Sequence, residues 1–107
     1  MAKWDEALYG NAILTDESKL QLWAPTKLNM HGKIIEVAYG LGWGLQPFQG
    51  HRRVLHNGGM PGFSADFERF IDDKLTVIVL CNDAGVDADY LAVAVAGFYN
   101  KALHPKP

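Results

Sequence analysis

The segment Leu75–Cys81 is largely apolar on both of the faces that a β-strand would present. Successive side chains of a strand point to opposite sides, so such a strand needs cover above and below. The segment therefore predicts a strand in a sheet that is packed on both faces. The 107 residues are 49% hydrophobic and 21% charged, which is typical of a folded chain with a modest core.

Segments with period-two patterning come before this strand, and turn signals separate them. In residues 39–45 bulky side chains alternate with glycines, which predicts a strand with one bare face that another backbone can approach. Residues 52–56 follow the Gln49-Gly50 turn and predict the returning strand. Residues 63–68 predict a half-buried strand, and Asp72-Asp73 predicts the next tight turn. We expect four consecutive antiparallel strands.

Helical patterns flank these strands. Two short helices are predicted. The first covers residues 2–8, and the second starts at Thr15 or Ser18, which are both plausible caps, and is stopped by Pro25. Residues 26–37 show a weak pattern and predict a loop. Residues 87–103 predict an amphipathic helix. Its apolar stripe comprises Leu91, Ala94, Val95 and Phe98. The expected fold class is α+β, an antiparallel sheet of about four strands with N-terminal helices and a C-terminal helix packed on it.

Charge and composition exclude several kinds of partner. The formal net charge is −2 and Arg52-Arg53 is the only basic pair, which argues against nucleic-acid binding. No stretch is long enough to cross a bilayer, and no secretory signal is visible, so we expect a cytoplasmic chain. We expect no cofactor, because no helix follows the glycines of residues 39–45, and no metal. His51 and His56 are expected on opposite faces, and Cys81 is expected to be a buried hydrophobe.

Five short motifs follow one another along the chain. They are residues 1–8, Tyr39-Gly40-Leu41-Gly42-Trp43, His56-Asn57-Gly58-Gly59, Pro61-Gly62-Phe63-Ser64 and Val79-Leu80-Cys81-Asn82. In this order they resemble the penicillin-recognising serine hydrolases, which include class C β-lactamases, DD-peptidases and serine esterases. The resemblance implies that residues 1–107 are a single partial domain, the C-terminal part of such a hydrolase, with Met1 at an internal methionine. Full-length relatives are often exported.

The resemblance also assigns roles to one motif. Family members use Ser-x-x-Lys for the attack, Tyr-x-Asn or Ser-x-Asn for proton transfer, and Lys-Thr-Gly or a histidine version on a strand facing the serine. His56, Asn57 and Gly58 match the third motif, and the N–H of Gly59 would be half of the oxyanion hole. The alternative interpretation is a strand end followed by a turn, because Asn-Gly is a common turn pair.

The attacking group is missing from the sequence. Ser18 and Ser64 are the only serines, and neither has a lysine three positions later. Tyr9-Gly10-Asn11 matches the second motif, but it stands in the wrong order and is expected to end a helix. We therefore expect a truncated hydrolase without turnover of its own. A ligand-binding or self-assembling module and an enzyme with an unrecognised nucleophile stay open as alternatives.

The missing part has a consequence for assembly. In the family the strand that corresponds to Leu75–Cys81 has a neighbour that this sequence lacks, so the strand should form an open edge. Such an edge favours pairing with another chain. We expect a homodimer or larger assembly through Leu75–Cys81, and a missing N-terminal half supplied in trans is a further expected partner.

Overall fold

The computed structural model describes residues 1–106. The chain divides into two compact units, Met1–Leu45 and the residues from Gln46 onward. No helix in the described part combines the length and apolarity needed to cross a membrane.

The first unit begins with the two expected helices. They are α1 (Ala2–Ala7) and α2 (Asp16–Leu22). The Thr15 hydroxyl caps α2 by accepting a hydrogen bond from the Ser18 N–H at 3.2 Å. This cap satisfies one of the amide groups that a helix start leaves without an internal partner.

The expected loop at residues 26–37 is wrong, because this segment forms a β-hairpin. Strands β1 (Thr26–Met30) and β2 (Lys33–Val37) pair antiparallel. The turn between them has positive φ at His31 (52°) and Gly32 (84°), the geometry that suits the twist of a tight hairpin. Most hairpin side chains are exposed, so the sequence lacks the apolar alternation that marks a half-buried strand.

The glycine-rich segment forms less strand than expected. Only β3 (Gly44–Leu45) is a strand, and Tyr39 makes an isolated bridge to Gly44. The bare face is nevertheless used as expected. A side chain at Gly40 would collide with the carbonyl of Leu22, and the Leu41 N–H donates to that carbonyl at 2.9 Å.

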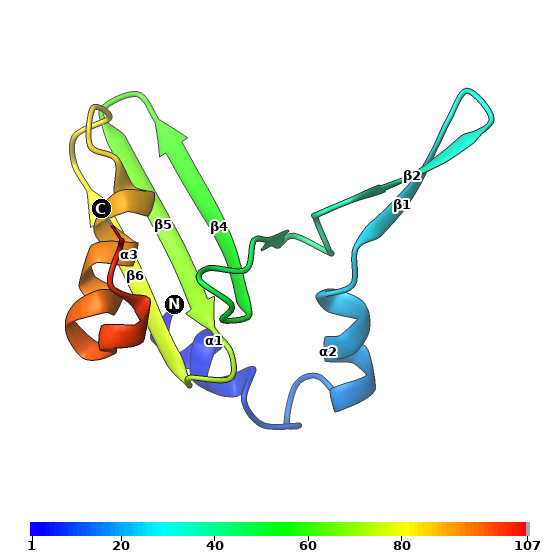
Figure 1. The fold of residues 1–107 in the computed structure, drawn as a ribbon, viewed down its shortest axis with the longest axis horizontal. Coiled ribbons are helices and arrows are strands. Elements are labelled where there is room, and N and C mark those ends of the chain that lie inside the picture. The colour runs from blue at the N-terminus through cyan, green and yellow to red at the C-terminus, as the bar shows by residue number, and fades with distance from the viewer. Residues whose placement is uncertain (107) are drawn as a thin grey trace. The chain divides into compact units, whose positions relative to one another are not determined.

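The second unit contains most of the sheet. Strands β4 (Arg53–Met60), β5 (Phe63–Phe70) and β6 (Leu75–Cys81) pair antiparallel in sequence order, and β3 is the fourth strand in the order β3-β4-β5-β6 (Figure 1). Turns at Gln49-Gly50 and Asp72-Asp73 connect as expected. The α+β class with a four-stranded antiparallel sheet is confirmed. Cys81 is half-buried rather than buried.

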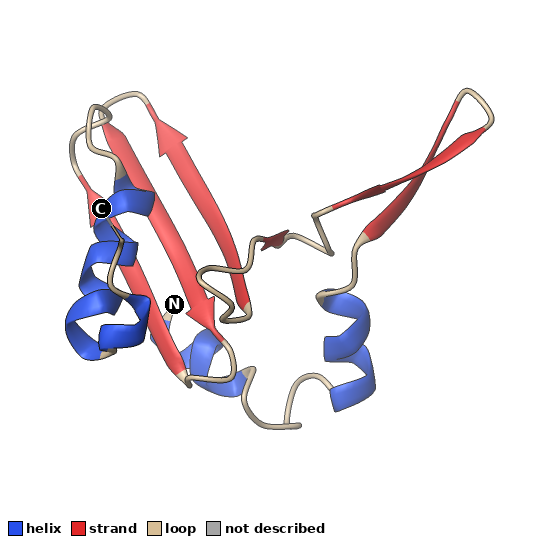
Figure 2. Ribbon diagram, in the orientation of Figure 1, coloured by secondary structure: helices blue, strands red, loops and turns tan. Residues whose placement is uncertain are grey.

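The C-terminal helix α3 (Ala88–Tyr99) and the 3₁₀ turn η1 (Lys101–Leu103) pack on one face of this sheet, as Figure 2 shows. The core at this contact comprises Phe70, Val77, Ala92, Ala96 and Leu103. The helix packing is confirmed, but the predicted stripe is wrong. The buried face is built from Ala88, Ala92, Val93, Ala96 and Gly97.

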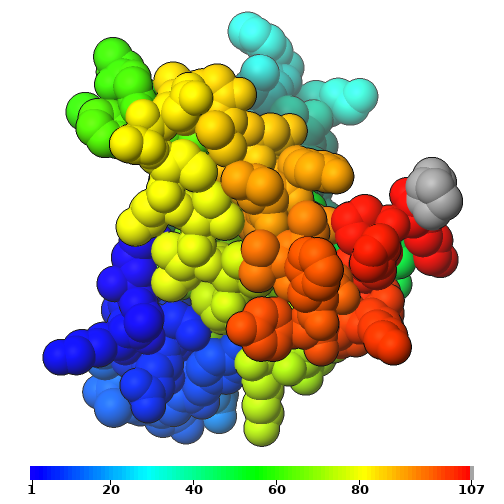
Figure 3. Space-filling view, turned by 90° about the vertical axis from the view of Figure 1, so that its left-hand side faces the viewer, coloured from blue at the N-terminus to red at the C-terminus, as the bar shows by residue number. Residues whose placement is uncertain are grey.

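Small residues explain this choice of face. They let α3 lie close to the sheet and let Gly97 meet the backbone of His104, where a side chain would clash. Phe98, which the sequence placed in the buried stripe, is 85% exposed. Figure 3 shows α3 in orange beside β6 in yellow. The helix is apolar nearly all round, so its bulky side chains indicated the wrong face.

Two phenylalanines test this assignment of the core. Phe70→Ala should lower the free energy of unfolding by about 3–5 kcal/mol, because Phe70 is fully buried and its removal leaves a cavity. Phe98→Ala, the matched change at an exposed site, should cost less than about 0.5 kcal/mol. Urea denaturation followed by circular dichroism measures both, and equal losses would contradict the assignment.

Candidate functional site

The motif His56-Asn57-Gly58-Gly59 lies inside β4 rather than at a turn. These residues pair in register with Phe67, Asp66, Ala65 and Ser64 of β5, and all four motif residues are exposed. The chain turns further on, at Pro61-Gly62, where Gly62 has a φ of 83°. The alternative of a strand end followed by an Asn-Gly turn is therefore wrong.

The backbone of Gly59 points away from β5. Met60 and Phe63 close the tight hairpin, so their polar backbone groups face each other, and those of the preceding residue face outward. Arg53 and Gly59 are an even number of residues apart on β4, so their backbone groups point to the same side. The Arg53 carbonyl accepts from the Gln46 N–H at 3.2 Å on the outer side of β4. The two-residue β3 reaches only that end of β4. The Gly59 N–H is thus directed at the outer edge of β4.

The motif borders two open depressions. One, of about 200 Å³, lies between Asn57, Gly58 and residues 86–89 at the start of α3. The other, of about 250 Å³, is apolar and lies over Gly58, Gly59 and the hairpin end. The His56 Nδ1 lies 2.6 Å from the Asn57 carbonyl oxygen. Gly58 and Gly59 have no side chains, so an extended ligand can approach the strand edge beside these depressions.

Neither serine is placed as a nucleophile. The Ser64 hydroxyl donates to the Asp83 carbonyl at 2.9 Å. The Ser18 hydroxyl accepts from Thr15 Oγ1 at 3.0 Å, at the start of α2. The adjacent Lys19 amine instead contacts Asp16 at 2.8 Å and the Gly10 carbonyl at 3.2 Å. Both hydroxyls therefore serve local structure.

The other candidates also have structural roles. The segment Tyr9-Gly10-Asn11 directly follows α1, and its Asn11 amide donates to Asp16. The His51 Nδ1 lies 2.8 Å from an Asp73 carboxylate oxygen, and Arg52 pairs with Asp72 at 2.9 Å. The acids of the Asp72-Asp73 turn thus hold the chain ends of β4 and β5 together.

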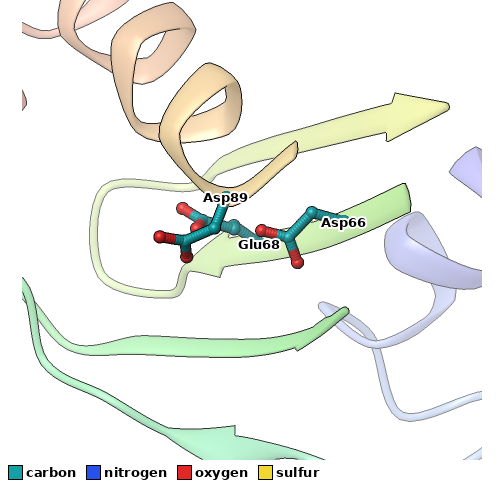
Figure 4. Close-up of side chains that lie close together, drawn as sticks. All are labelled: Asp66, Glu68 and Asp89. Atoms are coloured by element: carbon teal, nitrogen blue, oxygen red, sulfur yellow. The ribbon is translucent and has the colours of Figure 1, made fainter. Parts of the chain in front are cut away.

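The structure brings together a cluster of carboxylates that the sequence did not predict. Asp66 and Glu68 of β5 are 1% and 0% exposed, and they meet Asp89 from the first turn of α3 (Figure 4). The expectation of a half-buried strand was wrong here, because α3 covers the polar face of β5 too. The sequence held a signal for this burial, because it predicted a strand at Leu75–Cys81 covered on both faces, and the neighbour of such a strand is covered too. In the structure β6 itself is mostly half-buried.

Arg53 is the cation of this cluster. Its Nη1 lies 2.8 Å from Glu68 Oε1 and 3.6 Å from Asp89 Oδ1. Burial raises the pKa of Glu68 to about 8, with Arg53 opposing the rise and the two neighbouring aspartates adding to it. Burial also raises the pKa of Asp66, against the hydrogen bond that its carboxylate accepts from the Phe67 N–H.

Comparisons with known proteins add one relative. The chain is 42% identical over 82 residues to penicillin-binding protein 4* of Bacillus subtilis (strain 168). The match covers 75% of this chain and 17% of that protein, so the chain spans about a sixth of the relative's length. No family model matches, and no solved structure matches. The similarity supports kinship with the penicillin-binding and β-lactamase-like proteins.

The buried glutamate predicts a pH dependence of stability. The folded state holds a proton that the unfolded carboxyl, with a pKa of 4.5, releases, so the free energy of unfolding should fall as pH rises from 4.5 to about 8. Glu68 alone contributes at most about 1.4 kcal/mol per pH unit to this slope. Denaturation in EDTA at several pH values measures it. Glu68→Gln should flatten the curve and the exposed Glu17→Gln should not, whereas parallel curves for all three proteins would contradict the assignment.

Proposed function

We propose that this chain is the C-terminal part of a class C β-lactamase-like serine hydrolase that carries the third active-site motif. The outward N–H of Gly59 is the observation that carries this proposal. An oxyanion donor must be a fixed N–H aimed at the space where the attacked carbonyl lies. The similarity to penicillin-binding protein 4* supports the same family of chemistry.

Each motif residue has a part in this proposal. The imidazole of His56 stands where relatives carry a lysine or histidine that organises the substrate and proton network. Asn57 supplies the polar middle position, and Gly58 leaves room for a substrate along the β4 edge. Gly59 contributes one of the two oxyanion donors. No serine of the described chain is placed for attack, so turnover requires a Ser-x-x-Lys element from outside these residues.

A complementation experiment tests this proposal. The chain is mixed with a fragment of penicillin-binding protein 4* that lacks the matching segment, and a fluorescent penicillin or fluorophosphonate reports acylation. We expect labelling of the fragment only in the mixture. Labelling of the chain alone would instead show an enzyme with its own nucleophile, and no labelling of either partner would count against the proposal.

Two substitutions at Gly59 make the test specific. Gly59→Pro removes the outward N–H without removing a β4–β5 hydrogen bond, and it should slow acylation in the mixture by about 10²–10³-fold. Gly59→Ala keeps the N–H, and its added carbon would lie 3.9 Å from the Phe63 carbonyl oxygen, an ordinary contact. It should label at nearly the original rate. Equal rates for the two variants would refute the oxyanion role.

A second proposal concerns self-assembly through β6. In the sheet order β6 is an end strand, and its Leu80 side chain is 72% exposed. Ile78 and Leu80 alternate with the residues whose backbone bonds β5, so their N–H and C=O groups lie on the outer side. A second copy could add its own β6 antiparallel there and form a homodimer.

Light scattering tests this assembly. In size-exclusion chromatography with light scattering, the chain should elute with the mass of a dimer. Leu80→Lys should shift it toward monomer, because a charge on an edge strand disfavours pairing. Met60→Lys places the same charge at an equally exposed site outside β6 and should leave the dimer intact. A monomer at all concentrations would reject this proposal without affecting the complementation test.

A further inference from the structure

The cluster of Asp66, Glu68 and Asp89 has the geometry of an oxygen-ligand site. One carboxylate oxygen from each residue can be chosen so that all three lie within 4.8 Å of one another. Asp66 and Glu68 are alternate residues of β5 and so share the sheet face that α3 covers. Figure 4 shows the three carboxylates gathered between this strand and the first turn of the helix.

Two oxygens in the cluster lack a hydrogen-bond donor. Asp66 Oδ2 and Glu68 Oε2 are buried without a partner among the described residues, although both side chains are almost wholly inaccessible. A buried carboxylate oxygen without a donor is costly. Its other oxygen is engaged in each case, by the Phe67 N–H for Asp66 and by Arg53 for Glu68. The remaining oxygens can be satisfied by a cation, or by the proton that Glu68 keeps up to a pKa of about 8.

The charges indicate what that occupant can be. When a cation displaces the Glu68 proton, three carboxylates and one guanidinium leave two negative charges, which one divalent cation would balance. Carboxylate oxygens are the ligands that hard cations prefer, and Ca²⁺ binds them at about 2.3–2.6 Å, so two ligands of one Ca²⁺ can be up to about 5 Å apart. The side chain of Asp89 is 53% exposed and borders the depression at the start of α3, which leaves room for water ligands.

We propose that Asp66, Glu68 and Asp89 bind one divalent cation, with Ca²⁺ as the best fit, between β5 and the first turn of α3. The cation satisfies the two unpartnered oxygens and fixes the start of α3 against the sheet. Asp66 pairs in register with Asn57, so the site also supports the strand that carries the proposed hydrolase motif. This role is independent of the proposed hydrolase chemistry.

Metal titration of the purified chain tests the site. After EDTA treatment and dialysis at pH 8, CaCl₂ is titrated calorimetrically, and thermal unfolding is recorded with CaCl₂ or MgCl₂. We expect one bound Ca²⁺ per chain and a higher unfolding temperature with Ca²⁺. No heat and no shift at millimolar Ca²⁺ would overturn the proposal, and would leave protons as the occupants of the cluster.

Variants separate this site from nonspecific binding. Asp89→Asn removes the exposed ligand with little risk to folding, and Glu68→Gln keeps the shape of the buried one. Each should weaken Ca²⁺ binding at least tenfold and abolish the thermal shift. Asp72→Asn removes an exposed carboxylate that pairs with Arg52 and should leave both readouts unchanged. An unchanged affinity in Asp89→Asn and Glu68→Gln would overturn the proposal.

Discussion

The structure depends on the burial of β5 on both faces. Five consecutive residues of this strand, 66–70, are buried, so polar and apolar side chains alike are removed from water. On the α3 side Phe70 packs into the helix contact, while Glu68 and Asp66 come next on the same face. Arg53 from β4 contacts Glu68 and so offsets part of the cost of burying these acids. A buried acid without a partner would cost several kcal/mol or take up a proton.

Arg53 connects the apolar core to the acidic cluster. Its guanidinium lies 5.3 Å from the centre of the Phe48 ring, and Phe48 meets Phe70 edge-to-face at 6.4 Å. Its Nε donates to the Gln46 carbonyl at 2.9 Å, and its Nη1 faces Glu68. The planar guanidinium can make these contacts together, and a lysine could not. Packing and charge are therefore coupled at one residue, at the start of β4.

The sequence predicted strands wherever one pattern governed the segment. The sequence predicted β6 from the apolar run Leu75–Cys81 and β5 from the alternation of residues 63–68. It offered Thr15 and Ser18 as caps of α2, and the structure uses Thr15. Predictions were wrong where position in the fold overrode the pattern. The β1–β2 hairpin is exposed on most of its surface, so no apolar alternation marks it. In α3 small residues, rather than Leu91 or Phe98, face the sheet, because only small side chains allow that close approach.

The candidate sites show the same limit. The residues His56–Gly59 could be found because a motif carries its own order of residue types, and the structure adds the direction of one N–H. Asp66, Glu68 and Asp89 are spread over β5 and α3 and match no motif, so only the fold brings them together. The two sites share β4. Its first three residues are buried and include Arg53, and the remainder is exposed and carries the motif. Charge and packing thus hold the buried residues at the start of β4, directly before the exposed residues that carry the motif.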